Sequence, residues 1–204
     1  MLKIEKTDTA GWQAAFRGMR NPLNSWDKSD SYYTVDGEFV IGKKDIELAK
    51  KLAKAGSDHR KYLRQIFVSV DITAPLYWWK EFDTYKVGTV ANSCSTMHTI
   101  HKKEFELSDF SWELLEPLAL GSLEETIKVM NLYRGMYIHD GDKRWWQQII
   151  QLLPTSYEQK RTITFNYEVL VNMYHARKNH KLEEWHTLCS WIENLPLSEL
   201  ITCN

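Results

Sequence analysis

Residues Arg64 to His98 read R-Q-I-F-V-S-V-D-I-T-A-P-L-Y-W-W-K-E-F-D-T-Y-K-V-G-T-V-A-N-S-C-S-T-M-H, and the rest of the chain is organised around this stretch. Its first part predicts a β-strand, because Ile66, Val68 and Val70 occupy alternate positions and β-branched side chains suit a pleated sheet. Pro75 then stands where a helix begins, at the position that does not need its N–H. The two turns that follow are apolar and aromatic.

The composition changes abruptly after Phe82, where a polar run begins. Its polar members are Asp83, Thr84, Tyr85, Lys86, Thr89, Asn92, Ser93, Ser95, Thr96 and His98. A buried strand, an aromatic helix and then a loop rich in hydrogen-bonding groups are typical of a rigid scaffold that presents a ligand site. An ordinary Ser/Thr-rich turn after a packed helix is the alternative interpretation.

The whole chain of 204 residues predicts one domain, residues 1–204, with a substantial core, since 43% of residues are hydrophobic and 13% aromatic. A formal charge of −1 gives no basic field for nucleic acid. The three cysteines match no disulfide or metal spacing, which favours a reducing compartment. No signal peptide or bilayer-spanning run is apparent. We therefore expect a cytoplasmic protein with no membrane and no nucleic-acid partner.

Periodicity predicts more helices than strands. A strand over Leu2–Glu5 leads into a helix that Asp8 or Thr9 caps, and Asp36-Gly37 closes a hairpin over Tyr32–Ile41. Further helices are expected over Lys43–Ala55, from Asp109 or Ser111, and over Ser122–Met136, Trp145–Leu153, Asn166–Arg177 and Leu182–Ile192, with a strand over Lys160–Phe165. The fold class is therefore α+β, mixed α/β, with a small sheet flanked by long helices. Asp140 and Asp142 are too few carboxylates for a calcium loop, so no metal site is expected.

Two separated blocks carry a resemblance to a known family. The first, His59 to Pro75, reads H-R-K-Y-L-R-Q-I-F-V-S-V-D-I-T-A-P and is similar to a His-x-(Ser/Thr)-Pro-x-x-His block followed by a strand and a helix start. The second begins at Leu153-Pro154 and passes through Asn166, Asn172 and Arg177 to Glu184-Trp185. In this order the blocks resemble the flavin-dependent thymidylate synthases, also called thymidylate synthase complementing proteins. The resemblance covers roughly residues 43–100 and 145–192.

The resemblance implies a homotetramer in which FAD lies at subunit interfaces and a dUMP-like nucleotide lies against the flavin. The family moves a methylene group from a folate to the uracil ring and reduces it with a flavin hydride, and NADPH is the reductant. No nucleophilic side chain is required, so the absence of an evident catalytic cysteine is no objection.

The chain departs from the family where the family carries cationic donors. Thr84-Tyr85-Lys86 stands in place of Arg-His-Arg, and Thr89 in place of the following Ser. Met97 falls where an arginine is expected to bind dUMP, and Glu81 replaces a glutamine. Replacing a bidentate guanidinium by a thioether forfeits ~1.5–3 kcal/mol of charge-assisted hydrogen bonding. Lys86 and His98 restore positive charge only as point donors.

The resemblance assigns two sets of binding residues and no catalytic side chain. The flavin set is His59, Thr84, Tyr85, Lys86, Asn166 and Asn172, and the nucleotide set is Glu81, Ser93, Ser95, Thr96, His98 and Arg177. Each has a structural alternative, such as helix capping for His59 and Asn166, a solvated face for Asn172, and interaction with the helix dipole for Arg177.

Two functions follow from these patterns. The first is a divergent FAD-dependent thymidylate synthase-like enzyme that acts on a uracil nucleotide. The second is a catalytically inactive member that binds a nucleotide or a flavin, and it is favoured by the missing arginines. The same flavin chemistry on a different base or acceptor fits both sets of observations.

Overall fold

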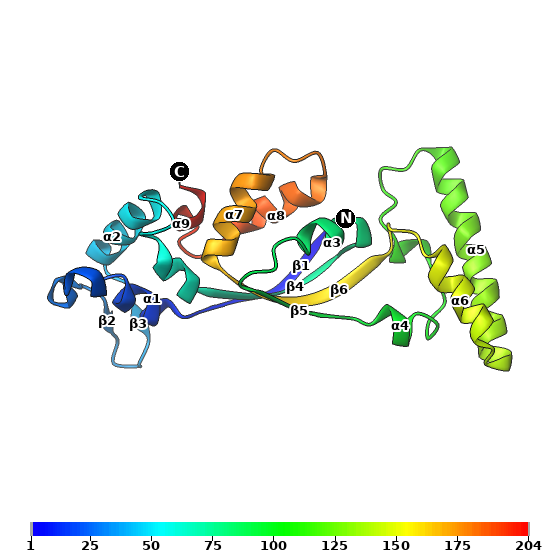
Figure 1. The fold of residues 1–204 in the computed structure, drawn as a ribbon, viewed down its shortest axis with the longest axis horizontal. Helices are drawn as coiled ribbons and strands as arrows, with labels where there is room; N and C mark the ends of the chain where they lie inside the picture. Colours follow the sequence, from blue (N-terminus) through cyan, green and yellow to red (C-terminus); the bar gives the residue numbers. More distant parts are fainter. Residues whose placement is uncertain (1, 204) are drawn as a thin grey trace. The chain divides into compact units, whose positions relative to one another are not determined.

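The computed structural model describes residues 2–203 and has the predicted α+β fold, a small sheet with many helices (Figure 1). The main sheet has the strand order β1 (Lys3–Ala10), β4 (Phe67–Pro75), β6 (Glu158–Asn166), β5 (Thr89–Ser93), and β2 (Tyr32–Tyr33) pairs with β3 (Phe39–Val40). The helices are α1 (Trp12–Gly18), α2 (Lys43–Lys54), α3 (Leu76–Phe82), α4 (Thr96–Thr99), α5 (Pro117–Asp140), α6 (Lys143–Leu152), α7 (Tyr167–Arg177), α8 (Glu183–Glu193) and α9 (Glu199–Thr202). Short 3₁₀ turns cover Asn21–Leu23, Trp26–Lys28, Lys61–Gln65 and Leu107–Asp109.

The chain divides into two compact units, and the strands of the main sheet contribute residues to both. Unit 1 holds residues 2–3, 72–84 and 92–162, and unit 2 holds residues 4–71, 85–91 and 163–203. The single domain over residues 1–204 stays a prediction. Within residues 2–203, no helix is both long enough and apolar enough to cross a membrane.

The first half of β4 lies in unit 2 and forms the strand that the alternation of β-branched residues predicted. Val68 and Val70 are buried, whereas Phe67, the first residue of the strand, is exposed. The N-terminal strand is longer than predicted and ends at Ala10, and Gly11, with φ 87°, separates it from α1. A Cβ at Gly11 would lie 1.9 Å from the carbonyl oxygen of Gln65, so this close approach requires glycine. Asp8 and Thr9 therefore belong to the strand, and the prediction that one of them caps the helix is wrong.

Unit 1 contains the helical hairpin α5–α6, whose core includes Leu123, Ile127, Met130 and Ile149. The helix predicted from Asp109 or Ser111 is wrong, since that region holds only the 3₁₀ turn Leu107–Asp109, and the next predicted helix, Ser122–Met136, corresponds to α5, which begins earlier, at Pro117. The reason is local pairing: Phe110 forms an antiparallel bridge with Tyr157, and the Ser111 N–H donates to the Ser156 carbonyl at 2.8 Å. These contacts hold Phe110 and Ser111 in an extended conformation, a turn follows over Trp112–Leu115, and Pro117 then opens the helix.

Candidate functional site

A cavity of about 700 Å³ in unit 2 is bordered by His59, the first residue of the predicted flavin set. Its volume lies within the range of small-molecule and cofactor sites. The lining combines polar and apolar side chains: Asn21, Asp58, His59, Lys61, Gln65, Met19, Pro22, Leu23, Leu52 and Tyr62, with Gly18. His59 is exposed, and its backbone N–H donates to the carbonyl of Gly56 in the turn after α2.

The residues next to His59 are tied to two helices. Arg60 Nε lies 3.0 and 3.2 Å from the two carboxylate oxygens of Glu168 on α7, and both side chains are mostly buried. The Tyr62 hydroxyl donates to the Ala49 carbonyl of α2 at 2.8 Å, and burial raises the pKa of this tyrosine. His59 therefore lies at the cavity on a segment held from both sides.

Arg177 lies at the end of α7 against an aromatic wall. Its guanidinium carbon is 4.6 Å from the Trp185 ring centroid and 5.6 Å from that of Tyr85. Its Nε donates to the Tyr85 hydroxyl at 2.9 Å, and the Tyr85 and Trp185 rings meet edge to face. The structure thus brings together Tyr85, assigned to the flavin, and Arg177, assigned to the nucleotide. Trp185 supports both residues, and its only signal in the sequence is the Glu184-Trp185 pair of the family resemblance.

Asn166 is buried and caps α7, because its Oδ1 accepts from the Val169 N–H at 3.1 Å. Gly88, with φ 78°, lies directly against this cap. A Cβ at Gly88 would come within 2.9 Å of Asn166 Nδ2 and 3.2 Å of Val169 Cγ2. The loop that carries Tyr85 and Lys86 is therefore fixed to the start of α7. Lys86 and Asn172 are exposed.

In unit 1 the polar residues form two local caps. The Thr84 hydroxyl donates to the Glu81 carbonyl at 2.7 Å at the end of α3. Ser95 caps the four-residue helix α4, and its Oγ accepts from the His98 N–H at 3.3 Å. Ser93 and His98 are exposed, and Thr96 is half-buried. The predicted nucleotide residues of this loop are thus close in space, with one serine hydroxyl and one backbone N–H engaged in the cap.

Arg161 on β6 is a cation beside this loop that sequence analysis did not assign. Its guanidinium lies 4.2 Å from the Trp79 ring centroid, and its Nη1 is 2.7 Å from Asp83 Oδ1. Its Nε donates to Gln159 Oε1, while Gln159 Nε2 donates to the Cys94 carbonyl at 2.9 Å. The strand alternation was the available signal, since Arg161 is in phase with the apolar Ile163 and Phe165.

Comparison with solved structures identifies the fold. The Helicobacter pylori flavin-dependent thymidylate synthase ThyX, in a crystal structure complexed with FAD and dUMP, has a TM-score of 0.72 at 18% identity, over 98% of both chains. A UMP/dUMP methylase, PolB from Streptomyces cacaoi bound with 5-Br dUMP, has a TM-score of 0.68 at 13% identity, over 98% of this chain and 93% of that one. The chain has the ThyX fold. No protein-family model and no curated protein matches the sequence.

Within this ThyX fold, the predicted residues divide between the two units. Unit 2 holds His59, Tyr85, Lys86, Asn166, Asn172 and Arg177, and unit 1 holds Glu81, Thr84, Ser93, Ser95, Thr96 and His98. The division does not follow the assignment to flavin or nucleotide, since Thr84 lies in unit 1 and Arg177 in unit 2. The ligand assigned to each residue stays a prediction.

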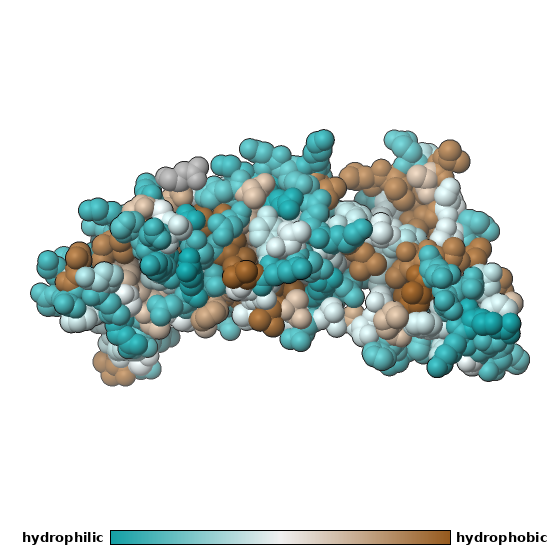
Figure 2. Space-filling view, in the orientation of Figure 1, coloured by the Kyte–Doolittle hydropathy of each residue, from teal (hydrophilic) through white to brown (hydrophobic). Residues whose placement is uncertain are grey.

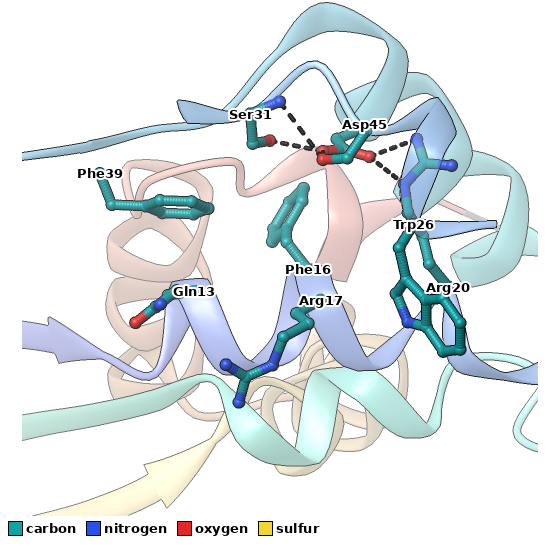
Figure 3. Close-up of a pocket in the computed structure, with 9 residues that line it drawn as sticks. Gln13, Phe16, Arg17, Arg20, Trp26, Ser31, Phe39 and Asp45 are labelled. Carbon is teal, nitrogen blue, oxygen red and sulfur yellow. Dashed lines mark hydrogen bonds and ion pairs between the residues drawn. The ribbon is translucent and has the colours of Figure 1, made fainter. Parts of the chain in front are cut away.

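A second cavity in unit 2, of about 200 Å³, lies over the ion pair of Arg20 and Asp45 (Figure 3). Both side chains are buried, and Arg20 Nε lies 2.6 Å from Asp45 Oδ1. The hydroxyls of Ser29 and Ser31 each donate to Asp45 Oδ2 at 2.5 Å. Because protein donors already engage both carboxylate oxygens, this network joins α1 to α2 and serves the fold.

Proposed function

We propose that this chain is a cytoplasmic, homotetrameric flavoprotein of the thymidylate synthase type that modifies a uracil nucleotide. In the proposed reaction a folate donates a methylene group to a dUMP-like substrate, with NADPH as reductant. The observation that carries the proposal is the full-length likeness of fold to two enzymes, one crystallised with FAD and dUMP and the other, a UMP/dUMP methylase, with 5-Br dUMP.

The cavity beside His59 fits an edge of FAD. A planar ring system needs apolar contacts and polar atoms at its edge, and the cavity lining includes the apolar Pro22, Leu23 and Leu52. His59 and Gln65 in the same lining offer hydrogen-bonding groups. When bound, FAD would supply the hydride, and this chain would supply position and electrostatics.

Arg177 would bind the nucleotide phosphate. Stacking on Trp185 and the hydrogen bond to Tyr85 hold the guanidinium in place, so less side-chain freedom is lost when an anion binds. In unit 1, Arg161 would be a guanidinium donor beside the loop of Ser93, Ser95 and His98, and Asp83 shares its charge.

The alternative is an inactive family member that binds a nucleotide or a flavin. The observation that favours it is the loop chemistry: Met97 is 53% exposed where the family resemblance expects an arginine. In addition, the Tyr85 hydroxyl is engaged by Arg177 where the resemblance expects a histidine flanked by arginines. Binding without turnover is the expected behaviour in that case.

The visible spectrum separates these functions. The purified protein is measured alone and after incubation with FAD and dUMP, followed by an assay for dTMP with methylenetetrahydrofolate and NADPH. We expect retained, stoichiometric flavin and product formation. Flavin or nucleotide binding without product would support the inactive module. Binding of neither ligand would overturn both functions.

Two separate histidine variants, one at the cavity and one outside its lining, test whether the cavity binds flavin. His59→Ala is expected to lower flavin occupancy, because a group at the cavity rim is removed. His139→Ala changes an exposed histidine at the end of α5 and is expected to leave occupancy unchanged. Equal flavin content in the two variants would remove His59 from the site.

A further inference from the structure

Helix α5 has an exposed stripe on the side opposite its buried face. Leu123, Ile127 and Met130 are buried in the hairpin core with Ile149 of α6. At 100° per residue, the opposite side of the helix carries an exposed stripe at spacings of three and four residues. This α5 stripe consists of Leu118, Gly121, Glu125, Lys128, Leu132 and Gly135. Figure 2 shows hydrophobic surface over the α5–α6 hairpin.

The leucines and glycines of the stripe are unexplained by the chain's own packing. Leu118 is 87% exposed and Leu132 is 57% exposed. A Cβ built on Gly121 or Gly135 meets nothing within 4 Å, and neither residue has a positive φ. Glycine lowers the stability of a helix interior. The stripe therefore carries two protruding side chains, the knobs Leu118 and Leu132, and two positions without a side chain, the notches Gly121 and Gly135. Packing within the chain does not account for any of the four.

The order of these residues is self-complementary. A two-fold axis that passes beside α5, perpendicular to it and level with the midpoint between Thr126 and Ile127, brings the reversed stripe of a second copy opposite the first. Under this axis Leu118 lies opposite Gly135 of a second copy, and Leu132 lies opposite Gly121 of that copy. The central pair also matches, since Glu125 lies opposite Lys128 of the second copy. Every knob thus meets a notch and every charge meets its opposite.

We propose that the α5 stripe pairs antiparallel with the α5 stripe of a second copy of this chain. An isologous contact requires each patch to complement itself, which this order of residues satisfies. Glycine lets two helix backbones approach closely, and a facing leucine fills the space. Lys128 Nζ and Glu125 Oε2 lie 3.1 Å apart in one helix, and the pairing gives each charge a second partner. The proposal needs no bound ligand and supplies one contact of the proposed homotetramer.

The packing of a leucine against a glycine is tested by moving the large side chain from one position to the other. Gly135→Leu has room within its own chain, so the fold and melting temperature are expected to be retained, while the added side chain meets Leu118 of the second copy. We expect self-association to weaken by about tenfold or more in sedimentation velocity. The double variant Leu118→Ala/Gly135→Leu moves the knob to the other position and is expected to restore most of the affinity.

The central charges are tested in the same way. Lys128→Glu places like charges opposite each other and is expected to weaken self-association, and Glu125→Lys/Lys128→Glu is expected to restore it. Lys143→Glu on α6 makes the same change of charge in the same hairpin and is expected to have no effect. A monomeric wild-type chain, or an assembly that is unchanged by Gly135→Leu and Lys128→Glu, would overturn the pairing. Flavin and nucleotide binding are measured separately, so neither result decides the proposed chemistry.

Discussion

Arg177 shows how a single side chain links the fold to the proposed chemistry. The guanidinium stacks on Trp185 and donates to Tyr85, so its direction is fixed before any ligand arrives. A charge-assisted contact to phosphate contributes ~1.5–3 kcal/mol. Arg177→Ala is therefore expected to weaken dUMP binding by roughly 10- to 100-fold in isothermal titration calorimetry.

Two further variants separate charge from geometry at this position. Arg177→Lys keeps the charge but lacks the planar fork and its stacking, so we expect it to recover only part of the affinity. Lys178→Ala removes the neighbouring exposed cation and is expected to bind dUMP like the wild type. If Arg177→Ala and Lys178→Ala bind equally well, Arg177 is not a phosphate ligand.

At the scale of single residues, the sequence indicated some members of the candidate site and not others, and the reasons are physical. It singled out Asn166 and Arg177 through the family resemblance, and the capping alternative for Asn166 describes its observed hydrogen bond. Arg161 was missed, because the strand alternation indicates which face it occupies but not which residues it contacts. The contact of Arg161 with Trp79 and Asp83 joins residues far apart in the chain, and only the fold brings them together.

Helix α7 depends on Asn166 at its first turn, and this allows capping and flavin binding to be separated. Asn166→Ala removes the acceptor for the Val169 N–H and is expected to lower the free energy of unfolding by about 1 kcal/mol. Asn166→Asp keeps the acceptor and is expected to leave stability nearly unchanged, whereas it removes the amide donor.

Urea unfolding and flavin titration measure the two effects. Reduced flavin binding in Asn166→Asp, at wild-type stability, would support the predicted cofactor role of the amide. If only Asn166→Ala differs from the wild type, in stability alone, the residue is a helix cap and nothing more.

The elements that sequence predicted well are those with strong local signals. The hairpin β2–β3 turns at Gly37 with φ 82°, as the Asp36-Gly37 pair predicted, although Asp36 itself does not have a positive φ. The helix predicted from Asp109 or Ser111 did not form, although Ser111 is an acceptable helix cap by sequence. Its backbone pairs instead with Ser156, across a separation that no local pattern contains.

At the scale of the whole molecule, His175 links stability to pH. Burial lowers the pKa of this histidine, as do the nearby charges of Lys178 and Arg60, while backbone hydrogen bonds to Ile201 and Cys203 oppose the shift. Below about pH 6.5 the unfolded chain therefore binds a proton more readily than the folded chain. Stability is expected to fall as the pH drops from about 6.5 through the lower, folded pKa.

The variant His175→Gln removes this contribution. We expect its free energy of unfolding to fall less than that of the wild type between about pH 7.5 and pH 5, as measured by urea unfolding. His139→Gln, at an exposed position, is the matched control. Identical pH profiles for the wild type and His175→Gln would contradict the assignment.

The contact of Gly88 with the Asn166 cap has a consequence for how this protein evolves. The path of the loop is set by Gly88 and the start of α7, and these positions are distinct from Tyr85 and Lys86, whose side chains the family resemblance assigns to ligand binding. Mutation of the exposed Lys86 therefore leaves the contact of Gly88 with Asn166 in place, whereas Tyr85 is also held by Arg177 and Trp185. A lineage with this arrangement can vary the side chain at position 86 through single codon changes while the path of the loop is kept.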